Sequence, residues 1–207
     1  MIIAGTGSGR PRDPDLDRRI ADAAVEIFGQ EGWSSFSVEA VARRAGVGKA
    51  SVYRRWSSKE ALLAEALATR LDVITDVDTG SVRGDLVQLV RQLLELYGGE
   101  HGRAALRLGI EAELIPGLAQ RYAEVTRDQI RAVRTIVRRG IERGELPKQT
   151  SATHLLDVLC GGSMNHAMAT RLTPSDVLRP RPGRECPYAE RFVEFVLASL
   201  LVEEGPA

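Results

Sequence analysis

Cysteine and net charge are both scarce in this chain. Its 207 residues include only two cysteines, Cys160 and Cys186, and 28 basic side chains balance 28 acidic ones. Two cysteines without a C-x-x-C spacing do not build a disulfide framework or a zinc site, so we expect reduced thiols. A formal charge of zero excludes a polycation that contacts nucleic acid with its whole surface, although a local basic patch remains possible.

Long apolar runs are also missing. No run approaches the roughly 20 residues that a membrane-spanning helix needs. The first residues do not lead from a basic stretch into an apolar one, so no secretory signal is predicted. We therefore expect a cytoplasmic protein with no membrane partner.

Motifs of enzyme active sites are absent as well. The chain has no nucleophile elbow, no P-loop and no His-Glu-x-x-His. Its three histidines, His101, His154 and His166, have neither metal-ligand nor triad spacing. We expect no catalytic residues, no metal and no cofactor, and an enzyme is only a remote alternative.

A basic segment from Ser37 to Glu60 is the most informative feature that is present. Between Val41 and Lys59 it contains six basic residues and no acidic one. Two short helical patterns, about 37–45 and 49–55, flank a turn at Gly46, where we expect a positive φ that glycine tolerates. The pattern predicts a helix-turn-helix, which places its second helix in the DNA major groove.

Outward-facing polar residues of this segment are suited to contact phosphates and base edges. A Ser57–Glu60 capping box predicts the start of the next helix, which continues to about residue 74. Lys59, in its first turn, is placed to hold a phosphate. The candidate DNA-contacting residues are Ser37, Arg44, Gly48, Lys49, Ala50, Ser51, Tyr53, Arg54, Trp56 and Lys59.

The same segment resembles the tetracycline-repressor (TetR) family of bacterial transcription regulators. Members look like A-G-V-S-K-G-T-L-Y-R-Y-F-P-S-K-E-x-L, and residues 45–62 read A-G-V-G-K-A-S-V-Y-R-R-W-S-S-K-E-A-L. The resemblance covers residues 10–67 and is specific as a set. Gly48, Trp56 and Ser57 depart from the residues that the family often has, which leaves the operator sequence open.

Apolar periodicity predicts helices along the rest of the chain, at about 16–31, 82–97, 103–114, 118–143, 151–170 and 188–201. No stretch alternates like a strand. We expect an all-α fold of about nine helices. Its parts are a flexible arm (1–14), a helix-turn-helix domain with a connecting helix (15–75) and a regulatory ligand-binding and dimerisation domain (76–207).

The helix expected at 118–143 carries arginines at 127, 131, 134, 138, 139 and 143. They resemble a second DNA-binding patch, but we interpret them as a solvated helix face. The last helix is apolar around much of its girth, and the resemblance implies that it pairs with a second subunit in a four-helix bundle. Candidate interface residues are Leu155, Leu159, Phe192, Phe195, Val196 and Leu200.

The resemblance also implies a small-molecule effector bound among the helices beyond residue 80. Candidate pocket residues are Leu93, Tyr97, Leu106, Ile110, Tyr122, Thr126, Ile130, Met164, Asn165 and Met168, although the pattern of each is more typical of core packing. The predicted function is a ligand-responsive repressor that binds a palindromic DNA operator as a homodimer. An activator or a ligand-independent DNA-binding protein of the same fold is the alternative.

Overall fold

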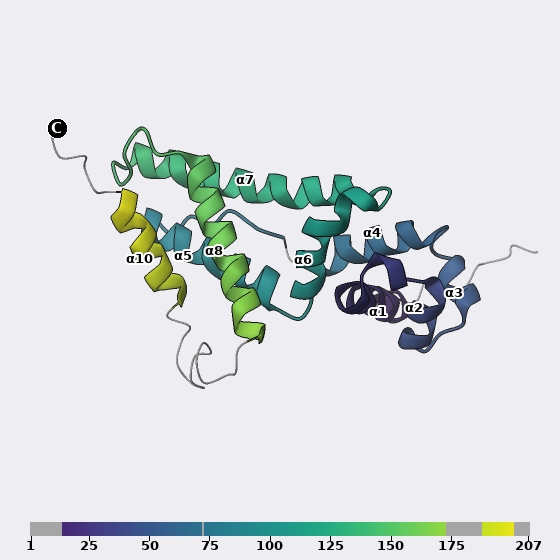
Figure 1. Ribbon diagram of the computed structural model, residues 1–207. Coiled ribbons are helices and arrows are strands. Elements are labelled where there is room, and N and C mark those ends of the chain that lie inside the picture. Colours follow the sequence, from purple (N-terminus) through teal and green to yellow (C-terminus); the bar gives the residue numbers. More distant parts are fainter. Residues whose placement is uncertain (1–13, 72, 173–187, 201–207) are drawn as a thin grey trace, which may run out of the picture.

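The computed structural model describes residues 14–71, 73–172 and 188–200 (Figure 1). Within these ranges the chain forms nine α-helices, two short 3-10 helices and no strand, which confirms the predicted all-α class. None of the described helices is long and apolar enough to cross a membrane. The helices are α1 (Pro14–Glu31), α2 (Val38–Ala45), α3 (Lys49–Tyr53), α4 (Lys59–Arg70), α5 (Val82–Gly98), α6 (Gly102–Glu111), α7 (Leu118–Glu142), α8 (Ala152–Leu172) and α10 (Tyr188–Leu200).

Several predictions concern residues outside those ranges. They are the flexible arm up to residue 13, Cys186, and the end of the last helix beyond residue 200.

Helices α1 to α4 form the N-terminal bundle. Helix α1 packs against α2 and α4 through a buried apolar stripe that includes Ile20, Ala24, Ile27 and Phe28. The 3-10 helix Trp33–Ser35 follows α1, and Phe36 behind it is buried. These contacts fix the position of the short helices α2 and α3 at one end of the molecule (Figure 1).

The start of α4 differs from the predicted capping box. Ser58, not Ser57, is the N-cap: its backbone is extended and its hydroxyl accepts the Ala61 N–H at 3.1 Å. The helix also ends at Arg70, short of residue 74. Leu71 and Ile74 are both buried in the segment that follows, so their spacing of three imitated a helical face.

Helices α5 to α10 form the C-terminal bundle. Helix α5 lies at its centre and packs against α6, α7, α8 and α10, because it is apolar around much of its circumference. The main helix contacts between this bundle and the N-terminal one, within the described residues, are those of α6 with α1 and of α7 with α4. Figure 1 shows α6 between the two bundles.

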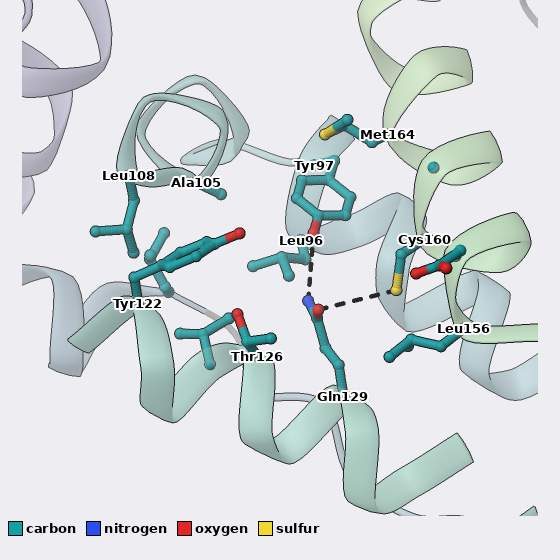
Figure 2. A pocket seen from close by; sticks show the side chains of 14 residues that line it. Leu96, Tyr97, Ala105, Leu108, Tyr122, Thr126, Gln129, Leu156, Cys160 and Met164 are labelled. Atoms are coloured by element: carbon teal, nitrogen blue, oxygen red, sulfur yellow. Dashed lines mark hydrogen bonds between the residues drawn. The ribbon is translucent and has the colours of Figure 1, made fainter. Parts of the chain in front are cut away.

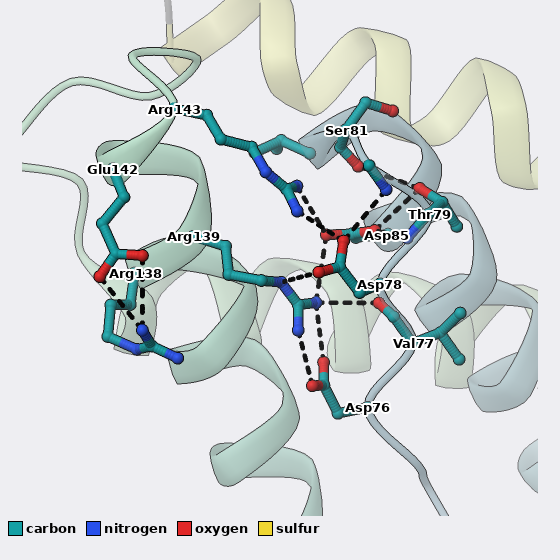
Figure 3. A network of polar contacts seen from close by, with 12 residues as sticks. Asp76, Val77, Asp78, Thr79, Ser81, Asp85, Arg138, Arg139, Glu142 and Arg143 are labelled. Atoms are coloured by element: carbon teal, nitrogen blue, oxygen red, sulfur yellow. Dashed lines mark hydrogen bonds and ion pairs between the residues drawn. The ribbon is translucent and has the colours of Figure 1, made fainter.

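The prediction that the arginines of α7 form a solvated face is wrong for Arg139, which is held in a network of ion pairs. Its guanidinium hydrogen-bonds both carboxylate oxygens of Asp76, at 2.7 and 2.8 Å, and a carboxylate oxygen of the buried Asp85 at 3.1 Å (Figure 3). The hydrogen bonds that Arg139 donates to Asp76 raise the pKa of Arg139 above its usual value. Arg143 pairs with Asp78 at 2.5 Å in the same network. The network attaches the segment between α4 and α5 to the end of α7, whereas Arg127, Arg131, Arg134 and Arg138 are exposed as predicted.

A candidate DNA-binding face and a candidate ligand pocket

The turn between α2 and α3 has the backbone geometry that the sequence predicts. Gly46 adopts the left-handed conformation with φ 67°, and its N–H caps the end of α2. At the other end of α2, the Ser37 hydroxyl accepts the Ala40 N–H at 3.2 Å. Val47 is half-buried against the core, and Gly48 is the extended N-cap of α3. Each of these residues serves to hold α3 at a fixed angle to α2.

One side of α3 is buried and the other is open to solvent. Val52 is fully buried, whereas Lys49, Ala50, Tyr53 and Arg54 are exposed, with 48% of Tyr53 accessible. The Lys49 ammonium lies 5.5 Å from the centre of the Tyr53 ring. The exposed side therefore presents two cations and a phenol next to a small residue that permits close approach.

Two of the predicted DNA-contacting cations, Lys49 and Arg44, form ion pairs with acidic residues of the protein. Lys49 forms an ion pair with Glu39 of α2. The hydrogen bond between them lowers the pKa of Glu39 and raises the pKa of Lys49. Arg44 likewise pairs with Glu26 of α1 at 2.7 Å. DNA phosphates would compete with these carboxylates for the same cations.

Trp56 and Lys59 have roles inside the bundle that the sequence did not indicate. Trp56 is 6% exposed, and its indole N–H donates to Glu65 at 2.8 Å, so this predicted DNA contact is a core residue. The Lys59 ammonium lies 3.8 Å from the centre of the Trp33 ring and 3.4 Å from the Phe36 carbonyl oxygen. Lys59 is half-buried there.

A cavity of about 230 Å³ lies in the C-terminal bundle, among α5, α6, α7 and α8 (Figure 2). Four of the predicted pocket residues line it: Tyr97, Tyr122, Thr126 and Met164. Six of the predicted residues do not line it, namely Leu93, Leu106, Ile110, Ile130, Asn165 and Met168. Of these, Leu93 is buried in the core and Ile110 is 79% exposed on the surface. The lining residues that the prediction missed are Leu71, Leu96, Ala105, Leu108, Val125, Gln129, Leu156, Asp157, Cys160 and Gly161.

A chain of polar groups crosses one wall of the cavity. The Gln129 amide N–H donates to the Tyr97 hydroxyl oxygen at 3.3 Å, and the Cys160 thiol donates to the Gln129 carbonyl oxygen at 3.8 Å (Figure 2). Burial raises the pKa of Tyr97, and it raises the pKa of Cys160 to about 12. Both side chains are therefore neutral at physiological pH. A polar glutamine on the mainly apolar face of α7 was the signal that could have identified this wall.

The predicted dimer-interface residues divide into two groups. Leu155, Leu159 and Val196 are buried within the protomer, so they belong to its core. Phe195 is 71% exposed, and Phe192 and Leu200 are half-buried. Exposed apolar side chains also lie on α8, namely Val158, Met164 and Met168.

Within one protomer, Gly162 allows α8 and α10 to approach closely. A Cβ atom at Gly162 would lie 2.3 Å from the Phe192 ring. Among the residues that the structure describes, no cluster of three or more His, Cys, Asp or Glu side chains could hold a metal ion.

The two bundles together define a class of protein: a helix-turn-helix unit with an exposed basic recognition helix, joined to a larger helical unit that contains a cavity. Two family models match the corresponding parts of the chain. The model described as bacterial regulatory proteins, tetR family, matches residues 20–66, and the tetracyclin repressor-like C-terminal domain matches residues 76–179.

The chain belongs to the TetR family of bacterial transcription regulators. It is 32% identical over 155 residues to the HTH-type transcriptional regulator AqdR of Rhodococcus erythropolis, a match that covers 74% of each protein. The DNA-binding regulatory function predicted from residues 37–60 is thereby confirmed.

Solved structures share the fold at low sequence identity. MexZ, described as a key repressor responsible for antibiotic resistance in Pseudomonas aeruginosa, superimposes with a TM-score of 0.70 at 21% identity. That match covers 93% of this chain and 98% of MexZ. FadR from Bacillus subtilis, solved in complex with stearoyl-CoA, gives a TM-score of 0.63 at 18% identity and covers 87% of this chain and 97% of FadR.

Proposed function

We propose that this protein is a ligand-responsive repressor that binds a palindromic DNA operator as a homodimer. The observation that carries the proposal is the solvent-exposed side of α3, on which Lys49, Tyr53 and Arg54 stand free of the core. Tyr53 and Arg54 would bind phosphates, and Lys49, at the start of α3, would reach a base edge or a phosphate. Ser37, Arg44, Gly48, Ala50 and Ser51 would lie at the same DNA surface.

The domain division of the proposal follows the two bundles. Residues 15–75 would form the DNA-binding domain with its connecting helix, and residues 76–207 the regulatory domain. Members of the family are transcription regulators and not enzymes, so we infer that this chain has no catalytic activity. We also infer that it works in the cytoplasm. Its partners would be operator DNA, a second copy of itself and one small molecule.

Dimerisation would use the exposed apolar side chains of α8 and α10. Phe195 on α10 and Val158 and Met168 on α8 leave large apolar areas in water in a single protomer. A second copy that covers them would form a four-helix bundle from two helices of each subunit. Its two recognition helices would read half-sites about 34–36 Å apart, or a multiple of that distance.

The cavity would hold the effector, since its wall includes α6, which also contacts the N-terminal bundle. Arg107 of α6 donates to the carbonyl oxygens of Gly29 and Gln30 at the end of α1, at 3.1 and 3.3 Å. Glu111 of α6 accepts the Trp33 N–H at 2.9 Å. A ligand that favours one position of α6 would thereby favour one position of α1. It shifts the equilibrium only by its difference in affinity for the two positions.

A selection of genomic fragments with the purified protein at near-physiological salt tests the DNA-binding part. We expect a recovered palindrome, with log affinity that falls by about 0.9 per neutralised phosphate for each unit of log salt. Tyr53→Ala and Arg54→Ala should abolish the enrichment. A protein that retains no sequence motif, or retains it equally in both variants, would contradict the proposed recognition by α3.

A transcription assay tests whether the protein represses or activates. Transcription from a promoter that contains the recovered operator should fall when the protein is present. An increase would support the activator alternative with the same DNA-binding surface.

A further inference from the structure

Few charged side chains line the cavity. Its lining, within the part of the chain that the structure describes, includes no Lys, Arg or His, and Asp157 is its one ionisable acid besides the tyrosines and Cys160. Asp157 is exposed to solvent, where water and salt screen its charge. An anionic ligand placed inside would lose its hydration without a compensating cation, which is costly. The lining therefore selects against carboxylates and phosphates.

The size of the cavity limits the ligand further. A cavity of about 150 Å³ is enough for a benzene ring in a protein core. The volume of about 230 Å³ here has room for one ring with a short substituent. Leu96, Leu108, Val125 and Leu156 supply apolar walls for such a ring, and Met164 supplies a flexible one. A long acyl chain exceeds this volume.

One hydrogen-bond donor faces this apolar space. The Tyr97 oxygen accepts from Gln129, and Gln129 in turn accepts from Cys160, so all three side chains are held in one orientation. Within the described residues, the Tyr97 hydroxyl takes part in this one hydrogen bond and donates none, so its O–H is available as a donor. Burial keeps this phenol protonated, because it raises the pKa of Tyr97. Tyr97 is half-buried, and an acceptor on a ligand would give its O–H a hydrogen bond that the protein does not supply.

We propose that the effector is a neutral molecule the size of one substituted ring, with a carbonyl or similar acceptor that receives the Tyr97 O–H. The inference rests on the proposed function only in calling this molecule the effector. The binding chemistry itself is a property of the cavity and can be tested without DNA.

Four probes of similar size separate charge from hydrogen bonding: acetophenone, benzoate, benzylammonium and ethylbenzene. Their binding to the full chain would be measured by calorimetric titration. We expect acetophenone to bind at least about tenfold more tightly than benzoate, because benzoate would bury an unpaired charge. We also expect acetophenone to bind about threefold to tenfold more tightly than ethylbenzene, the range of one net hydrogen bond. Tyr97→Phe should remove the preference for acetophenone over ethylbenzene and keep the preference for acetophenone over benzoate.

Position 161 offers a matched pair of variants that locates the binding. A Cβ atom at Gly161 meets no other atom within 4 Å, and this residue lines the cavity. Gly161→Leu should fill the space and abolish binding of both neutral probes, whereas Gly161→Ala should retain it. Circular dichroism and sizing of both variants would establish that they fold and assemble alike.

The proposal is overturned if benzoate or benzylammonium binds as tightly as acetophenone, if no neutral probe binds up to its solubility limit, or if Gly161→Leu leaves binding unchanged. Operator affinity with and without acetophenone is measured separately. Binding of acetophenone without an effect on the operator would leave the cavity chemistry intact and contradict ligand-responsive regulation. A protein that binds its operator but none of the neutral probes would contradict the ligand class alone.

Discussion

Tyr53 and Trp56 lie three positions apart, yet one is half exposed and the other is core. Trp56→Ala should lower the free energy of unfolding by about 3 to 5 kcal/mol, because it removes a large buried ring and leaves Glu65 without its donor. Tyr53→Ala should leave thermal stability almost unchanged and weaken operator binding at least about tenfold. Denaturant titration and a DNA-binding assay measure the two effects. Equal loss of stability in both variants would contradict this division of roles.

Glu39 is the acidic residue closest to the recognition lysine. Glu39→Gln removes the carboxylate that pairs with Lys49, so we expect operator affinity to rise about threefold and its salt dependence to steepen. The affinity would be measured over a salt series, with Glu31→Gln, an exposed carboxylate at the end of α1, as the control. Weaker binding of Glu39→Gln would instead mean that this carboxylate contacts a base.

Individual residues of the cavity were harder to predict than those of the turn. Gly46 and Ser37 act within four residues of their own positions, so the local sequence was enough to assign them. Gln129 and Cys160 become wall residues only because α7 and α8 face each other across 31 residues of sequence. Ile110 shows the converse: it is apolar and on the expected helix, but α6 turns it to solvent.

Among the elements, α7 shows how two neighbouring arginines can differ. Arg139→Ala should destabilise the protein by about 2 kcal/mol, because the buried Asp85 loses its closer cation and keeps only Arg143, at 3.5 Å. Arg138→Ala is the matched control, since Arg138 is exposed and its ion pair within the described part of the chain is with Glu142, one turn away. It should change stability by no more than about 0.5 kcal/mol. Chemical denaturation of both variants would test this, and a similar loss for both would contradict the network.

The contact between α6 and α1 carries a prediction about transmission. Arg107→Ala removes two hydrogen bonds to the end of α1, so the effect of a ligand on operator affinity should fall at least about threefold. Affinity of the free protein for the ligand should not change, because Arg107 does not line the cavity. Titrations of ligand and of DNA, each with and without the other, measure the coupling. Arg103→Ala, at an exposed arginine one turn earlier, is the control, and an unchanged coupling in Arg107→Ala would exclude this contact as the route.

Helix boundaries follow the same division between local and distant causes. The helices around residues 37–45, 82–97 and 118–143 were predicted within a few residues, because caps and apolar periodicity act locally. Ser58 and Ser57 are chemically equal candidates for a cap, and only the path of the chain after Trp56 decides between them. Similarly, Leu71 and Ile74 keep helical spacing outside a helix, since the core of the folded protein receives both.

For the whole molecule, the prediction concerns assembly. Phe195→Asp should convert the proposed dimer to a monomer, because it places a charge where an exposed ring would be covered by the second copy. Ile110→Asp is the matched control, as Ile110 is equally apolar and 79% exposed but lies on α6, away from α8 and α10. Sedimentation velocity over a concentration series measures both. A monomeric wild-type protein, or a Phe195→Asp variant that stays dimeric, would contradict the proposed interface.

The sequence by itself determined the all-α class, the helix-turn-helix and the family, since these depend on periodicity, caps and a glycine turn that act over a few residues. Only the tertiary structure decided that Trp56 and Arg139 are internal, that Leu155 and Leu159 are core, and which side chains surround the cavity. The physical reason is that an apolar or charged helix face specifies that it needs a partner. Which partner it finds depends on the packing of helices far apart in the chain.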